Sequence, residues 1–292
     1  PPSPAGTEQA YLWTLDDSGN VVNQTTLGTA PTLLDEQDDV KEEDKLTGVV
    51  RSESLDINNH GVAFGFTSLL NEFFTLHYAS VFKDGEAVWA LPEKTEGLTQ
   101  SRATHINDNG YILGYALRRS FQFTRKRLFI AHVDGREPVF PAGYFSHSGW
   151  EARDMNNQNL VVGRAERDRT HVQNRPTSAF LYDIETDTLT DLNAKLACNS
   201  EYYLYDAVSI NDNGEIIALA NKEITREIDG RTFTINSVQP LLLKASDTVE
   251  ACGDNTGDQT RKGAALSPIQ FAIAATLSLF GLLARRRVKL KK

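Results

Sequence analysis

Hydrophobic and polar residues recur along this chain in an order that occurs four times. In each copy an apolar residue precedes an Asn, a Gly or Asn stands three positions after that Asn, and a short apolar run follows. The copies are SLDINNHGVAFG (54–65), ATHINDNGYILG (103–114), ARDMNNQNLVVG (152–163) and VSINDNGEIIA (208–218). The residues before the Asn are 49, 49 and 55 positions apart. Such a period is typical of propeller blades or similar small β units.

Each copy predicts a tight turn followed by a strand. An Asn side chain can bond its own backbone two residues on, and Gly adopts positive φ without strain. Asn159 stands at the Gly position of the third copy, and Asn tolerates the left-handed conformation better than other residues with a Cβ. The predicted turn residues are Asn58, Gly61, Asn107, Gly110, Asn156, Asn159, Asn211 and Gly214. We expect the apolar residues before each Asn, Ile57, Ile106, Met155 and Ile210, to be buried.

A second pattern, about twenty residues after each turn, predicts β-hairpins. It occurs at 79–91, 126–140 and 178–192, with the turn pairs Asp84-Gly85 and Asp134-Gly135 in the first two. Weaker copies lie at 238–252 and 9–23, and the one at 9–23 has no Asn turn before it. The predicted fold is therefore all-β, a propeller-like array of four to five units of roughly 50 residues. Such an array either closes a small ring or forms part of a larger one.

The end of the chain predicts a membrane anchor. Residues 266–284 hold no charged residue, and that length is sufficient for a helix to cross a bilayer. The alternative is a buried core helix. Six basic residues lie in 285–292 and favour a cytoplasmic location for that tail. The predicted organisation is an ectodomain at 1–252, a polar stalk at 253–265, a transmembrane helix at 266–284 and a basic tail at 285–292.

Charge and cysteine usage suit an exported protein. The chain has 30 Lys and Arg against 39 Asp and Glu, an acidic balance that disfavours nucleic acid as a partner. Cys198 and Cys252 follow equivalent hairpins and are disulfide candidates, with two free thiols as the alternative. Since the chain begins at Pro1 without an initiator Met, we expect a longer precursor with a signal peptide.

No cofactor is predicted. The acidic segment 35–44 lacks the ligand spacing of a calcium loop, and Asp254, Asn255 and Asp258 form at best a weak calcium site in the predicted stalk. The stretch 117–127 interleaves five cations with phenylalanines, a pattern that suits nucleic-acid or glycan contact. On an acidic exported protein we interpret it as a hairpin with a charged outer face.

The turns, together with the strand Ala179-Phe180-Leu181-Tyr182, resemble the HAF repeat of extracellular bacterial proteins. Over residues 9–250 the chain resembles the bacterial domain-of-unknown-function family numbered 3466. This resemblance implies an exported β-repeat protein, and it brings no catalytic residues with it. The tail is similar to carboxyl-terminal sorting signals of Gram-negative bacteria, although Lys262-Gly263-Ala264-Ala265 stands where a glycine pair is expected.

The sequence favours a binding protein over an enzyme. Its six histidines show no metalloprotease spacing, and no nucleophile elbow or phosphate-binding loop is present. We expect a membrane-tethered or surface-sorted protein, in the periplasm or at the cell surface, that binds a partner protein, glycan or envelope component. The alternative is an extracytoplasmic polysaccharide hydrolase or lyase with paired carboxylates at a propeller channel.

Overall fold

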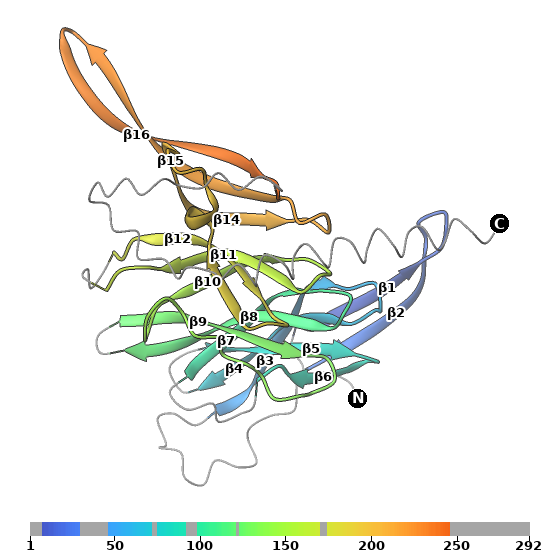
Figure 1. The fold of residues 1–292 in the computed structure, drawn as a ribbon. Helices are drawn as coiled ribbons and strands as arrows, with labels where there is room; N and C mark the ends of the chain where they lie inside the picture. The colour runs from blue at the N-terminus through green and yellow to red at the C-terminus, as the bar shows by residue number, and fades with distance from the viewer. Residues whose placement is uncertain are drawn as a thin grey trace. The chain divides into compact units, whose positions relative to one another are not determined.

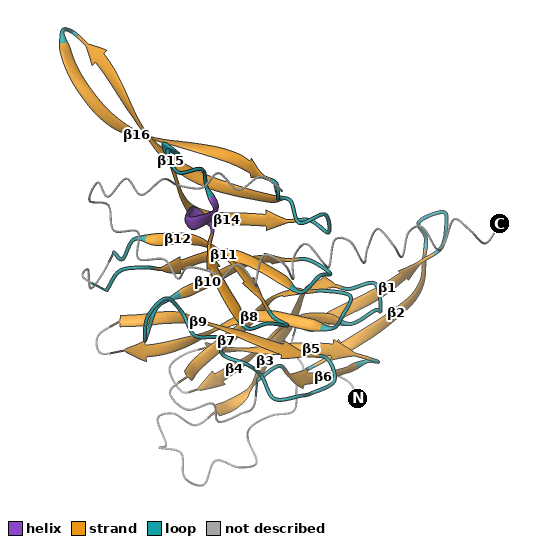
Figure 2. Cartoon of the chain, in the orientation of Figure 1, coloured by secondary structure: helices purple, strands orange, loops and turns teal. Residues whose placement is uncertain are grey.

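The computed structural model describes residues 8–29, 46–71, 75–91, 98–120, 123–169 and 174–245. These residues form antiparallel sheets, each made of strands that follow one another along the chain (Figures 1 and 2). The first two sheets are β1 (Ala10–Leu15) with β2 (Val21–Gly28), and β3 (Leu46–Ile57), β4 (Ala63–Asn71), β5 (Thr75–Lys83) and β6 (Glu86–Trp89). The third comprises β7 (Leu98–Ile106), β8 (Tyr111–Ser120) and β9 (Phe123–His132).

The fourth sheet contains β10 (Trp150–Met155), β11 (Leu160–Glu166), β12 (Thr177–Asp183) and β13 (Thr188–Asp191). A 3-10 helix at Leu192–Lys195 leads to the fifth sheet, β14 (Tyr202–Ile210), β15 (Ile216–Ile228) and β16 (Arg231–Leu243). The predicted all-β architecture is thus confirmed. The described sheets do not close into the expected propeller, because the sheets at the two ends of the series share no core with each other.

A separate hydrophobic core lies at each junction between successive sheets. From the first junction to the last, the cores are centred on Leu27 and Phe82, on Phe64 and Phe129, on Leu113 and Phe180, and on Val162 and Leu204. An inner strand consequently serves two cores with adjacent residues, as Ile112 and Leu113 of β8 do. This accounts for the continuous apolar runs after the turns, since both faces of these strands are buried.

Every sheet that carries an Asn turn has a bulge three residues before that Asn. The ladder register skips Leu55, Thr104, Arg153 and Val208 in β3, β7, β10 and β14. On the neighbouring strand, seven residues after the Asn, stand Gly65, Gly114 and Gly163, and Ala218 in the fourth copy. A Cβ at Gly163 would overlap the carbonyl oxygen of Glu151 on the bulged strand. The last Gly of the motif therefore permits close approach of two backbones.

Several sequence predictions fall on residues outside the described ranges. These are the acidic segment 35–44, Cys252, the stalk 253–265, the helix 266–284 and the tail 285–292. Cys198 lies in the turn after the 3-10 helix, and its predicted disulfide with Cys252 stays a prediction. No helix within the described ranges has the length and apolarity to span a membrane.

The close approach at Gly163 gives a stability test. We expect Gly163→Ala to lower the free energy of unfolding by about 1–3 kcal/mol, because the added methyl group displaces the bulged strand. The control is Gly214→Asn, since Gly214 has a φ of +74° and open space around it, and Asn159 already occupies the equivalent position. Thermal melting measures both variants. Equal shifts would contradict the role assigned to the strand glycine.

Candidate functional site

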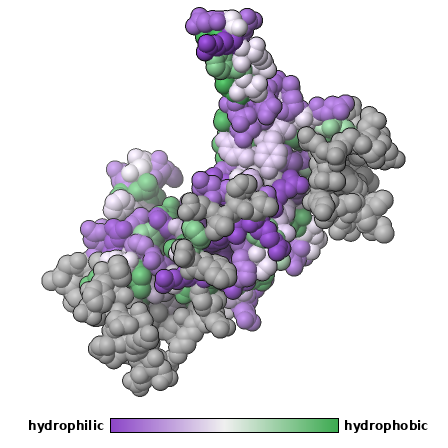
Figure 3. All heavy atoms as spheres, turned by 90° about the vertical axis from the view of Figure 1, so that its left-hand side faces the viewer, coloured by the Kyte–Doolittle hydropathy of each residue, from purple (hydrophilic) through white to green (hydrophobic). Residues whose placement is uncertain are grey.

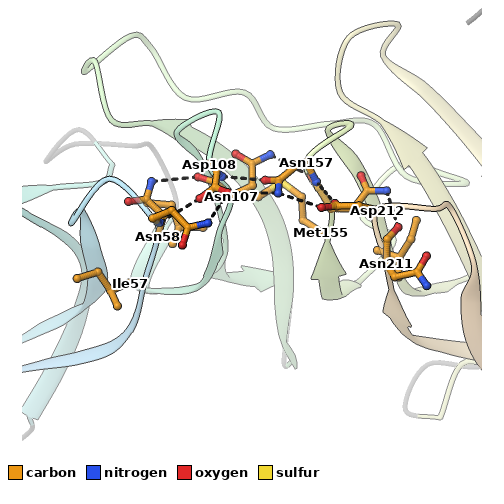
Figure 4. A pocket seen from close by; sticks show the side chains of 12 residues that line it. Ile57, Asn58, Asn107, Asp108, Met155, Asn157, Asn211 and Asp212 are labelled. Atoms are coloured by element: carbon orange, nitrogen blue, oxygen red, sulfur yellow. Dashed lines mark hydrogen bonds between the residues drawn. The ribbon is translucent and has the colours of Figure 1, made fainter. Parts of the chain in front are cut away.

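Four Asn turns lie side by side and line one hollow of about 350 Å³. Figure 4 shows their side chains directed toward one another along the row. Each sheet from the second to the fifth contributes three consecutive residues, namely Ile57–Asn59, Ile106–Asp108, Met155–Asn157 and Ile210–Asp212. We call Asn58, Asn107, Asn156 and Asn211 the first row, and Asn59, Asp108, Asn157 and Asp212 the second row.

The first-row Asn closes its own turn. In the third copy, Asn156 Oδ1 accepts hydrogen bonds from the backbone N–H groups of Gln158 (3.1 Å) and Leu160 (3.0 Å). The Asn159 N–H donates to the Asn156 carbonyl at 3.2 Å. The turn places Asn159 at a φ of +62°, and the equivalent Gly61, Gly110 and Gly214 also have positive φ. Local chemistry therefore accounts for the shape of each turn.

The same Asn side chain also joins its sheet to the next one. Asn58 Nδ2 donates to the carbonyl of Asn107, Asn107 Nδ2 to that of Asn156, and Asn156 Nδ2 to that of Asn211, each at 3.1 Å. Asn211 ends the row, and its Nδ2 donates to Glu215 Oε2 at 2.9 Å. Lys244 Nζ lies 2.7 Å from the other oxygen of Glu215. In the first three copies the carboxamide oxygen thus bonds its own turn, and the amide N–H bonds the next turn along the row.

The second row forms a parallel ladder in which Asn and Asp alternate. The backbone N–H of Asn59 donates to Asp108 Oδ1 (3.0 Å), that of Asp108 to Asn157 Oδ1 (2.9 Å), and that of Asn157 to Asp212 Oδ1 (2.9 Å). Side-chain amides add to these bonds. Asn59 Nδ2 donates to Asp108 at 2.8 Å, and Asn157 Nδ2 reaches Asp108 at 3.3 Å and Asp212 at 3.2 Å. The alternation matters because each carboxylate faces amide donors instead of a like charge.

Asn159 does more than tolerate a left-handed turn. Its Oδ1 accepts from Asn107 Nδ2 (2.8 Å) and Asn109 Nδ2 (2.9 Å), and its own Nδ2 donates to Glu185 Oε1 (2.8 Å). Tyr111 Oη also donates to this Glu185 oxygen at 3.1 Å. The Asn159 side chain, which the other copies lack because they have Gly at this position, therefore links the turn of the third copy to that of the second.

A further set of polar residues lies two positions before each first-row Asn, at Asp56, His105, Asp154 and Ser209. Asp154 Oδ2 accepts from Ser209 Oγ at 2.7 Å and from the Ile210 N–H at 2.9 Å. The His105 Nδ1 is buried and has no hydrogen-bond partner. Burial lowers the pKa of His105, and this effect outweighs the charges of Asp154 and Asp56, which raise it. The imidazole is therefore neutral at physiological pH.

The apolar residues before the Asn turns differ in burial. Met155 and Ile210 are buried and Ile106 is half-buried, whereas Ile57 is 42% exposed. The expectation that all four are buried was thus wrong for Ile57. Ile57 pairs with Ala63, whose side chain faces the β1–β2 sheet. Neither β1 nor β2 ends in an Asn turn, so no equivalent turn from the described strands covers Ile57.

Two carboxylates, those of Asp108 and Asp212, line the hollow. Hydrogen bonds from the backbone and side chain of Asn59 lower the pKa of Asp108. A hydrogen bond from Lys244, then one from Asn211, lowers the pKa of Glu215. Among the described residues, no group of three or more His, Cys, Asp or Glu side chains could hold a metal ion. The Asn and Asp residues of the hollow therefore form hydrogen bonds between sheets. The lowered pKa of Asp108 disfavours the protonated carboxylic acid that acid catalysis requires.

Within the basic stretch, residues 117–120 and 123–127 lie in the third sheet, and some of them contact the fourth sheet. Lys126 Nζ lies 2.8 Å from Glu151 Oε1, and Arg125 pairs with Glu166. Arg127 stacks over the ring of Phe140 at 4.4 Å. Part of this charge is therefore used to join neighbouring sheets.

Comparison with known proteins assigns the family. A family profile described as "Protein of unknown function (DUF3466)" matches residues 5–287. The chain belongs to the DUF3466 family. No curated protein matches the sequence.

A solved structure of a Mycobacterium tuberculosis puromycin-hydrolyzing peptidase is similar to the DUF3466 chain at 11% identity, with a TM-score of 0.36. The similarity covers 77% of this chain and 35% of the peptidase chain, so the protein spans about a third of that structure.

Sequence reasoning found the first row of the DUF3466 protein and missed the second. The signal was present in the four triplets Ile-Asn-Asn, Ile-Asn-Asp, Met-Asn-Asn and Ile-Asn-Asp, in which the third residue alternates. Its meaning depends on the turns standing next to each other, and a single sequence does not show that. The structure brings the predicted residues Asn58, Asn107, Asn156 and Asn211 together in the lining of the hollow. The other predicted turn residues, Gly61, Gly110, Asn159 and Gly214, close the same turns but do not line the hollow, and neither does Cys198.

Charge alternation in the second row can be tested with Asn157→Asp. This change places a third carboxylate between Asp108 and Asp212 and removes two amide donor contacts. We expect the melting temperature at pH 7 to fall by roughly 2–6 °C. The control is Asn213→Asp, which adds the same charge at an exposed residue of the last turn.

The fall in melting temperature of Asn157→Asp should depend on pH. As pH falls below about 4, the ordinary range of an Asp carboxyl, the introduced carboxyl becomes protonated and its repulsion weakens, so the difference in melting temperature between Asn157→Asp and the control should narrow. In the unchanged protein the lowered pKa of Asp108 stabilises the fold above its unfolded pKa, and this contribution is lost as pH falls through the folded value. Identical melting of the two variants at all pH values would contradict the ladder.

Proposed function

We propose that this DUF3466 protein is an exported, non-catalytic binding protein of the cell envelope. Its ligand is a glycan or another envelope component, bound at surfaces that the sheet array holds in place. One observation carries the proposal: the polar groups of the two rows bond to one another from sheet to sheet. Groups engaged in this way give a rigid edge and are unsuited to shuttling protons.

The polysaccharide hydrolase alternative receives less support from the hollow. A glycosidase needs one carboxylic acid whose raised pKa keeps it protonated near neutral pH. Asp108 has a lowered pKa, because the backbone and side chain of Asn59 donate to it. Asp108 and Asp212 also bind the same Asn157 amide, which stands between them. This arrangement leaves no room between these carboxylates for a sugar.

The proposed location rests on the sequence. The uncharged segment 266–284 and the basic residues after it favour a tether in the inner membrane, with 1–252 outside the cytoplasm. The acidic balance of the chain makes nucleic acid an unsuitable partner. We propose no cofactor.

Binding without cleavage is the expected result with polysaccharides. Purified protein is mixed with soluble and insoluble envelope polysaccharides, and protein retention and new reducing or unsaturated ends are measured. We expect retention on at least one polysaccharide with no new ends. New ends that disappear in Asp108→Asn would overturn the non-catalytic proposal, because that change removes the charge but keeps the shape of the side chain.

Location can be tested separately. The full precursor is expressed in a Gram-negative host, the cells are fractionated, and the mass of the mature carboxyl terminus is determined. We expect the intact tail in the inner-membrane fraction. Loss of everything after about residue 263 would make 266–292 a sorting signal and the protein a surface or secreted product.

A further inference from the structure

The fifth sheet extends into a two-stranded arm. β14 pairs with β15 only as far as Tyr202 and Lys222, whereas β15 and β16 stay paired from there to Ile228 and Arg231. The tip is Asp229-Gly230, and both residues have positive φ, as a tight hairpin turn requires. Figure 1 shows the arm projecting beyond the other strands of its sheet. We call residues 223–236 the arm.

The two faces of the arm differ in chemistry. One face carries the cross-strand pairs Ile224 with Ile235, Arg226 with Phe233, and Ile228 with Arg231. We call these six residues the apolar arm face. The opposite face carries Glu223, Thr225, Glu227, Thr232, Thr234 and Asn236. Ile228, Phe233 and Ile235 are 55%, 45% and 42% exposed, and Figure 3 shows hydrophobic residues at the surface of the arm.

The apolar arm face continues a surface that is buried elsewhere in the same strand. Ile216, Ala218 and Ala220 of β15 lie on this face and pack in the core against the fourth sheet. Beyond Lys222, no other described strand covers it. A hairpin of two strands is only marginally stable alone in water, so an apolar surface here favours a partner.

Charge restricts the kind of partner. The apolar arm face includes Arg226 and Arg231 and no carboxylate, because Glu223 and Glu227 lie on the other face. A second copy of the same face would bring guanidinium groups together, which is unfavourable. The complementary surface is apolar and carries anionic groups. An anionic lipid surface has both, because acyl chains accept the Ile and Phe side chains and phosphates pair with Arg.

The position of the arm in the chain agrees with a lipid surface. Only residues 244–265 separate the end of β16 from the uncharged segment 266–284. Even fully extended, a linker of that length reaches roughly 70–80 Å. We infer that the arm lies on the surface of an anionic bilayer, with the apolar arm face in the headgroup region. The inference rests on the membrane tether of the proposed function.

Tryptophan fluorescence tests this placement. Full-length Phe233→Trp protein is reconstituted into vesicles of phosphatidylglycerol and phosphatidylcholine, and the unchanged protein supplies the background of its three Trp residues. The matched control is Thr234→Trp, one position further on and on the polar face. We expect the added emission of Phe233→Trp to shift to the blue and to be quenched by brominated lipids. The added emission of Thr234→Trp should do neither.

The contribution of the two Arg residues to lipid binding is measured in a second experiment. Arg226→Gln together with Arg231→Gln, in the Phe233→Trp background, should reduce the ratio of bound to free arm on the order of thirtyfold. Vesicles of phosphatidylcholine alone should give a similar loss. Equal quenching at positions 233 and 234, or no quenching at 233 in anionic vesicles, would overturn the inference.

The experiment distinguishes an error in the proposed membrane tether from an error in the proposed contact between the arm and lipid. Sedimentation of the unchanged protein with vesicles, resistant to high salt, reports the tether, whereas quenching at position 233 reports the arm. Protein that sediments without quenching contradicts the arm alone. Protein that does not sediment contradicts the tether, and quenching on addition of anionic vesicles to that protein would still support the arm.

Discussion

The side-chain amide of the turn Asn is the group on which the array depends. Its oxygen closes the local turn, and its N–H bonds the turn of the next sheet. Asn107 and Asn156 are buried, so removing either amide would leave donors and acceptors unpaired at two places. Formation of one turn and docking of the next sheet are consequently linked. This linkage gives neighbouring repeats a common stability, as expected of arrays in which each unit contacts only its neighbours.

Packing between sheets imposes the remaining features of the motif. Because an inner strand serves two cores, its residues after the turn are apolar on both faces. The bulge before the Asn brings a carbonyl against the adjacent strand, and Gly65, Gly114 and Gly163 leave room for it. The apolar run, the bulge and the last Gly are therefore three consequences of stacking one sheet on the next.

The sequence predicted what is decided locally. Asn followed by Gly three residues later specifies a turn by itself, and a short apolar run after it specifies a strand. The second row was missed because its bonds join residues 49 or 55 positions apart. The arm was missed for a different reason. Residues 224–228 read Ile-Thr-Arg-Glu-Ile, and the Asp229-Gly230 pair after them is a hairpin signal. The repeat pattern placed the hairpin of this unit at 238–252 instead.

The fourth copy differs from the others in a way that ends the ladder. Val62, Tyr111 and Leu160 occupy the position four residues after the first-row Asn, whereas the fourth copy has Glu215 there. This carboxylate accepts a hydrogen bond from the Asn211 amide, for which the described residues provide no further Asn turn, and it pairs with Lys244. Terminal units of repeat arrays replace apolar contacts by polar ones. The exposed outer residues Ile217 and Leu242 of the fifth sheet thus lie beyond the ladder, on the same sheet as the arm. We therefore expect partners to contact this sheet rather than the row of turns, whose polar groups already bond to one another.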